Sequence, residues 1–203
     1  SDTRFDIIQA SLTDTWAATR AGAFALSENN LYTTEAFNQY YQHLKEDGIL
    51  TMSRYYTGSR PSETIRLVSL ALASWKEMGV PDPAENIVVV ASDFGVPIGT
   101  LILKKSPFSP EEIQRIEDVS RQLGFQVVYT PLSSSNEYFQ QLISSEDPRD
   151  FWRTYDLDVS PPTDDKPFFF HMLRLRDFLH PAAKGGALRF NNNAIVVLVA
   201  LLI

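Results

Sequence analysis

The sequence feature that most constrains the fold is a set of short apolar runs that alternate with amphipathic stretches. Each run has the length of a buried β-strand, and the runs lie at Phe5 to Leu12, Ile49 to Arg54, Asn86 to Ser92, Thr100 to Lys104 and Phe125 to Thr130. Strands that alternate with helices are typical of an α/β fold with a mainly parallel sheet. The run at Thr100 follows its predecessor so closely that we expect an antiparallel hairpin, placed at the edge of the sheet.

Helix boundaries are marked by local capping signals. Thr33 is a suitable N-cap for a helix to about Lys45, and Asp47-Gly48 should end it, with Gly48 in the left-handed conformation. The run Ser109-Pro110-Glu111-Glu112 combines a capping box with proline at the first helical position, and Gly124 is the expected C-terminal cap. These signals predict helices but say nothing about how the strands are ordered.

Composition excludes several classes of function. The 203 residues suffice for one domain, and the formal net charge of −7 argues against nucleic-acid binding, which needs a basic face. No cysteine is present, which excludes thiolate metal sites and cysteine nucleophiles. The three histidines, His43, His171 and His180, are scattered, so we expect no metal site. No two glycines have G-x-G spacing, so the usual nucleotide-binding turn is missing.

The last segment, from Ala194 to Ile203, is uniformly apolar. Ten residues cannot span a bilayer, and a buried strand is the alternative interpretation. We expect instead the start of a transmembrane helix over 191–203, preceded by a juxtamembrane connector over 159–190. Basic residues upstream place that connector on the cytoplasmic side, namely Arg174, Arg176, Lys184 and Arg189. Residues 1–158 would then form the α/β domain.

Ligands of α/β sheets bind beyond the carboxyl ends of the strands. The places to look are therefore Thr13 to Trp16 and Tyr55 to Gly58. Asp14 is the strongest single candidate, because a carboxylate there can orient an amine or accept its proton. The alternative is that Asp14 only forms a turn or caps a helix, as aspartate often does.

Weaker candidates each have a plain structural alternative. Glu28 belongs to a polar stretch, Ser27 to Asn30, that would be either a lid or a solvated loop. Tyr55 and its neighbour Tyr56 would either stack on a ligand or close the edge of the core. Asp164-Asp165 would bind a cation or form a solvated turn, and the run Phe168 to Phe170 is expected to pack.

Several stretches of the sequence resemble those of a known family. The stretch FDIIQASLTDTW, followed by SENNLYTTEAFNQYYQHLKEDGILTMSR, resembles the spermidine synthase-like fold, in which a strand ends in a D-S-S-D-P type motif. Without gaps, the first aspartate of that motif falls on Ser11, the second on Asp14 and the proline on Thr15. SPFSPEEIQRIEDVSRQLGF and SPPTDDKPFFFHML are similar to segments of large bacterial membrane proteins that carry such a domain.

The resemblance implies a partial Rossmann-like sheet of the class I methyltransferase type. It implies transfer of an aminopropyl or methyl group from S-adenosylmethionine or its decarboxylated relative to an amine or polyamine, without a metal. Asp14 and Ser11 would be catalytic, although a serine is no base at neutral pH without an activating partner. The residues expected to bind the substrate are Thr13, Trp16, Glu28 and Tyr55.

In that family the cofactor-binding half would lie upstream of Ser1, so 1–203 alone should bind cofactor poorly. The resemblance places the domain on the cytoplasmic side of the bacterial inner membrane, with the lipid bilayer as a partner. A homodimer is possible under the same resemblance. The alternative function is a non-catalytic ligand-sensing or scaffold module of a transporter-like membrane protein. The serine at position 11 favours that alternative.

Overall fold

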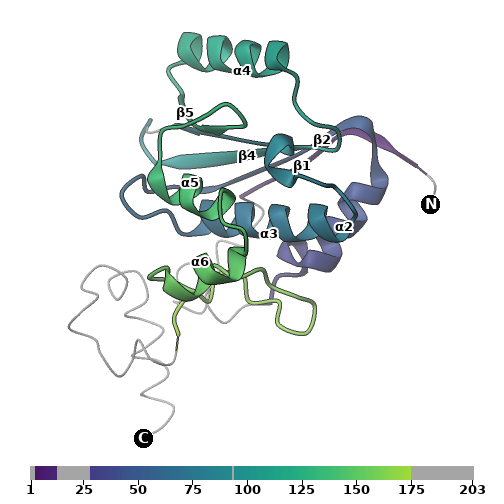
Figure 1. Cartoon of the computed structure of the whole chain (residues 1–203), viewed down its shortest axis with the longest axis vertical. Helices are drawn as coiled ribbons and strands as arrows, with labels where there is room; N and C mark the ends of the chain where they lie inside the picture. The colour runs from purple at the N-terminus through teal and green to yellow at the C-terminus, as the bar shows by residue number, and fades with distance from the viewer. Residues whose placement is uncertain (1–2, 13–27, 93, 175–203) are drawn as a thin grey trace, which may run out of the picture.

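The computed structural model describes residues 3–12, 28–92 and 94–174 (Figure 1). The described chain alternates strands and helices as expected, and two short 3-10 helices lie at Asn30–Tyr32 and Pro83–Asn86. The strands are β1 (Phe5–Ser11), β2 (Leu44–Tyr55), β3 (Ile87–Ser92), β4 (Ile98–Lys104), β5 (Gln126–Thr130) and β6 (Ser133–Ser134). The helices are α2 (Thr34–His43), α3 (Glu63–Glu77), α4 (Pro110–Leu123), α5 (Glu137–Ile143) and α6 (Pro148–Thr154).

The six strands form one open mixed sheet in the order β1-β2-β4-β3-β5-β6. Within it only the β1–β2 pair of the described strands is parallel, and the other neighbouring pairs are antiparallel. The α/β class is confirmed, but the prediction of a mainly parallel sheet is wrong. The β3–β4 hairpin is antiparallel as predicted, yet β4 lies inside the sheet and not at its edge.

The position of β4 explains why so many neighbours are antiparallel. β4 is inserted between β2 and β3, so β2 and β3 run in the same direction without touching as hydrogen-bonded partners. Gly99 of β4 pairs with Arg54 on one side and Ala91 on the other. A Cβ atom at Gly99 would lie 2.8 Å from Thr64 Oγ1, so glycine is needed where the first turn of α3 approaches the sheet.

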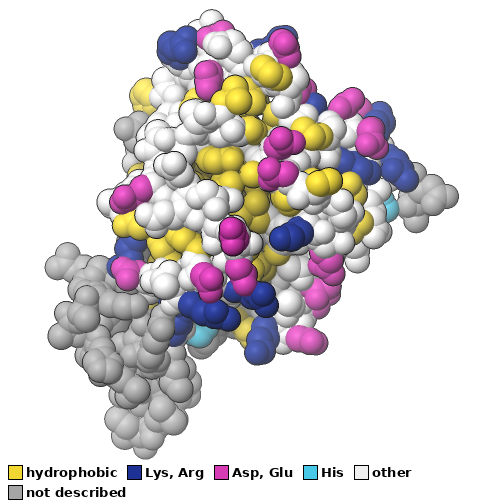
Figure 2. Space-filling view, in the orientation of Figure 1, with side chains coloured by type: hydrophobic (Ala, Val, Ile, Leu, Met, Phe, Trp, Pro, Cys, Tyr) yellow, Lys and Arg dark blue, Asp and Glu magenta, His cyan; other side chains and the backbone are white. Residues whose placement is uncertain are grey.

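Helices cover the two faces of the sheet unequally. The main core lies between the sheet and a layer that contains α2, α3 and α5, with α6 beyond them (Figure 1). Its largest fully buried side chain is Trp75 of α3, whose Nε1 donates to the Lys104 carbonyl at 3.0 Å. α4 packs alone on the opposite face over a small cluster formed by Val88, Phe108 and Ile113. In the same view, apolar side chains reach the surface in a band below α4 (Figure 2).

The first strand differs from its expected environment. We expected a buried strand inside the sheet, but β1 lies at the edge of the sheet that the described residues form. Phe5 is 47% exposed and Ile7 63% exposed, whereas Ile8 and Ala10 pack against the main core. β1 therefore has apolar side chains on both of its faces, but only the face with Ile8 and Ala10 packs against the core.

Gly48 does not cap a helix, which corrects a second expectation. α2 ends at His43, β2 begins at Leu44, and Gly48 lies within that strand without a positive φ. A Cβ atom at Gly48 would lie 2.9 Å from the Phe5 carbonyl oxygen. The glycine therefore allows β1 and β2 to approach closely next to an irregularity in their register.

The other capping signals are confirmed. The Thr33 side chain accepts from the Ala36 amide at the start of α2, and Gly124 ends α4 with a φ of 74°. Both hydrogen bonds of the capping box are present at α4, since Ser109 Oγ accepts from the Glu112 amide and the Glu112 carboxylate accepts from the Ser109 amide. Local chemistry thus fixes where these helices begin and end.

Removing the Ser109 cap should cost a measurable part of the stability. Ser109→Ala leaves the Glu112 amide without its side-chain acceptor, and we expect the free energy of unfolding to fall by about 1 kcal/mol. Urea unfolding followed by circular dichroism measures this change. Ser59→Ala, in an exposed turn, is the matched control and should change the stability by less than about 0.5 kcal/mol. An equal effect of both changes would contradict the capping role.

Candidate functional site

The carboxyl edge of the sheet gathers residues from three strands. β1 ends at Ser11, β2 ends at Tyr55, and β4 begins at Ile98 beside them. Of the residues predicted for the site, the structure therefore brings Ser11 and Tyr55 to the same edge. Thr13, Asp14 and Trp16 lie outside the described residues.

A row of three hydroxyl groups crosses the strands at this edge. Ser11 Oγ donates to Ser53 Oγ at 3.3 Å, and Ser53 Oγ lies 2.9 Å from Thr100 Oγ1. The register aligns them, because Ser11 pairs with Ser53 and Ser53 with Thr100. All three are half-buried. These groups do not ionise at neutral pH, so the row can orient a polar ligand but supplies no base.

The chain leaves β1 through a left-handed residue. Leu12 has a φ of 49°, an uncommon value for a residue other than glycine, and its amide donates to the Ser53 carbonyl at 3.4 Å. Strained backbone of this kind is found at functional sites more often than elsewhere. Leu12 directly precedes the candidate residues Thr13 and Asp14 in the sequence.

The other predicted residues have different surroundings. Tyr55 is 44% exposed, so its ring is available to a ligand at the edge. Its neighbour Tyr56 is buried and belongs to the core. Glu28 is exposed and precedes Asn29, whose amide donates to the Pro167 carbonyl at 2.8 Å. Of the Asp164-Asp165 pair, Asp164 accepts a hydrogen bond from Thr33 Oγ1 at 2.7 Å, which is a structural contact.

A buried arginine lies under the same edge, on the opposite face of the sheet. Arg54 is fully buried, and its Nε donates to Glu63 Oε2 at 2.8 Å. Its guanidinium also lies over the rings of Tyr32 and Phe170, 5.5 and 4.6 Å from their centroids. The pair connects the end of β2 to the first turn of α3. Sequence reasoning missed it, although the alternation of Leu50, Met52 and Arg54 places all three on one face.

The loop after β2 is held rigidly by the C-terminal helices. Asn136, the N-cap of α5, donates from Nδ2 to the Tyr56 hydroxyl at 3.2 Å and to the Gly58 carbonyl at 2.8 Å. Tyr155 donates its hydroxyl to the Pro61 carbonyl. Burial raises the pKa of Tyr56, against the opposing effect of the Asn136 hydrogen bond. Tyr56 is therefore a neutral phenol at physiological pH and supplies no base to the site.

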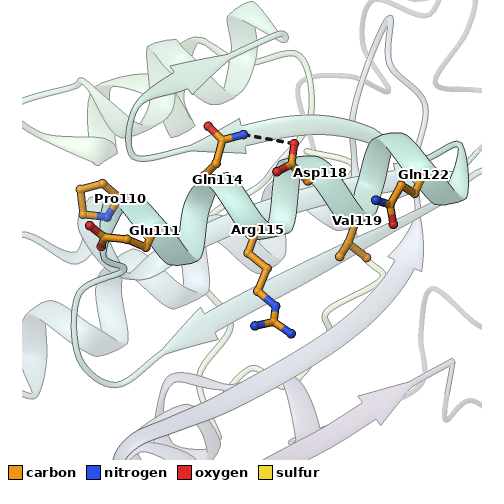
Figure 3. Close-up of a pocket in the computed structure, with 7 residues that line it drawn as sticks. All are labelled: Pro110, Glu111, Gln114, Arg115, Asp118, Val119 and Gln122. Atoms are coloured by element: carbon orange, nitrogen blue, oxygen red, sulfur yellow. Dashed lines mark hydrogen bonds between the residues drawn. The ribbon is translucent and has the colours of Figure 1, made fainter.

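Two hollows on the surface of the described residues lie away from this edge. One of about 650 Å³ is lined by seven residues that all come from α4 (Figure 3). Figure 3 shows Gln114 and Asp118 joined by a 3.2 Å hydrogen bond on its lining. A hollow lined by one helix is an open flank and not an enclosed site. A second, of about 530 Å³, lies between the start of β1 and α2 and includes Phe5, Ile7, Tyr40 and His43.

Three features of the described residues bear on the cofactor, metal and membrane predictions. The sequence has no glycine pair with G-x-G spacing of the kind that binds the phosphates of a nucleotide cofactor. Within 3–12, 28–92 and 94–174, no cluster of three or more His, Cys, Asp or Glu is arranged for a metal ion. In the same ranges no helix has the length and apolar character to cross a bilayer. The segment predicted to enter the membrane, 191–203, lies outside them.

The predicted connector begins within the described part of the chain. Residues 159–174 pack against the α/β layer, where Phe169 is fully buried and Phe170 is 6% exposed. The prediction that Phe168 to Phe170 serve packing is therefore confirmed for these two rings. Comparison with known proteins adds no further assignment: no protein-family model matches this chain, and no curated protein matches it.

Proposed function

We propose that the chain is the carboxyl-terminal part of a spermidine synthase-like transferase domain, with a Rossmann-like sheet of the class I methyltransferase type. The complete protein would transfer an aminopropyl or methyl group from decarboxylated or intact S-adenosylmethionine to an amine. Asp14 would accept the proton of that amine, Ser11 would orient it, and Thr13, Trp16, Glu28 and Tyr55 would line its path. The domain would lie on the cytoplasmic side of a bacterial inner membrane, tethered by 191–203.

The strand directions are the observation that carries this proposal. β1 and β2 are parallel and joined through α2, and β3 runs the same way as β2 after the α3 crossover. Two successive strand-helix-strand units of one direction are the basis of a Rossmann-like half. The ends of β1 and β2 therefore lie at the edge where such sheets bind ligands, and Asp14 follows within three residues of Ser11.

Under the proposal, the complete protein would bind the cofactor, as the resemblance implies. What 1–203 contributes, under the proposal, is the acceptor side of the site. Tyr55 supplies an exposed ring and the hydroxyl row a fixed set of hydrogen-bonding oxygens.

A transfer assay on the complete reading frame that contains this chain tests the proposal. Labelled S-adenosylmethionine and its decarboxylated form are supplied with a set of diamines and polyamines, and labelled product is measured. We expect transfer in the parent protein and a loss of at least about a hundredfold in Asp14→Asn, the usual effect of removing a general base. Turnover that is unchanged in Asp14→Asn would show that the catalytic assignment is wrong.

Ser11→Asp should strengthen the binding of a cationic amine. The substitution adds a carboxylate where the resembled motif has its first aspartate, and a charged hydrogen bond is worth about 1.5 kcal/mol or more. We therefore expect calorimetry with 1,4-diaminobutane to show a Kd about tenfold lower than in the parent. Ser11→Asn, which has the same size without the charge, is the control. An equal gain in both variants would argue against an ammonium ligand at this edge.

One observation favours the alternative of a non-catalytic ligand-sensing or scaffold module. The hydroxyl row contains no acid or base, and Ser11 stands at its outer end. Such a module would bind an amine through neutral groups and transfer nothing. The same assay separates the two functions, because the scaffold function predicts no product with either cofactor and no heat when either is titrated into the complete protein.

A further inference from the structure

We draw no further inference here: the strongest candidate, the outer edge of β1 with the exposed side chains of Phe5 and Ile7 and the adjoining hollow toward α2, carries none, because nothing among the described residues shows what covers this apolar edge.

Discussion

Replacing Arg66 by methionine is expected to lower the free energy of unfolding by about 3 to 5 kcal/mol. The Arg66 side chain donates to the carbonyls of Ser160, Phe168, Phe169 and His171, which would lose their charged donor. Each buried acceptor without a partner costs about 1 to 3 kcal/mol. The total loss should stay below the sum of these costs because carbonyls of residues 160–171 that become exposed regain hydrogen bonds to water. Chemical denaturation followed by tryptophan fluorescence measures the change.

Two further variants define what Arg66 contributes. Arg66→Lys keeps the charge but loses the planar fork that reaches several carbonyls, so an intermediate loss is expected. Arg115→Met removes an exposed arginine from α4 and should change the stability by no more than about 0.5 kcal/mol. If the stability of Arg66→Met changed by no more than that same small amount, the packing of residues 160–171 would not depend on the cation.

Gly99→Ala is expected to destabilise the protein clearly, because the added methyl group has no room. Its added methyl group would lie 2.8 and 2.9 Å from Thr64 Oγ1 and Cγ2 and 3.0 Å from Tyr56 Cβ. Thr64 is fully buried and its hydroxyl bonds to the Tyr55 carbonyl at 2.9 Å, so it cannot simply rotate away. Overpacking of this kind costs about 1 to 3 kcal/mol, more than alanine gains over glycine in a strand.

Gly58→Ala is the matched control for Gly99→Ala. At Gly58 the nearest atom to an added Cβ is the Tyr56 hydroxyl oxygen at 3.6 Å, an ordinary contact. Thermal unfolding of the two variants measures the contrast, and only the Gly99 variant should show a clearly lower Tm. Equal Tm values would mean that α3 can move away from the sheet at little cost.

Local chemistry made the helix ends predictable, whereas the order of the strands was not. Thr33, Ser109 and Gly124 act on amides and carbonyls a few residues away, so their effect can be read from adjacent letters. The place of β4 between β2 and β3 depends on which strands meet across the sheet. The apolar pattern of Ile98 to Lys104 is the same for an edge strand as for an inner one.

The same distinction holds for the candidate site. Tyr55 was predicted at the carboxyl edge because it follows an apolar run, and Ser11 was named because the resemblance aligns it with the first aspartate of the family motif. Ser53 and Thr100 were missed, since they join Ser11 only through the register of three strands. Arg66 was missed for a related reason, because its acceptors lie 94 to 105 residues further along the chain.

The insertion of β4 creates an alternative that the folding chain must reject. The β3–β4 hairpin closes over a short turn and can form early, but it has two free edges that could meet β2. Docking by the other edge would place β3 directly beside β2 as a parallel pair, in a compact but misassembled sheet. Ala91 pairs with Gly99, so that wrong arrangement would bring a methyl group near the first turn of α3. The absence of a single side chain in β4 thereby helps to decide which way round the hairpin docks.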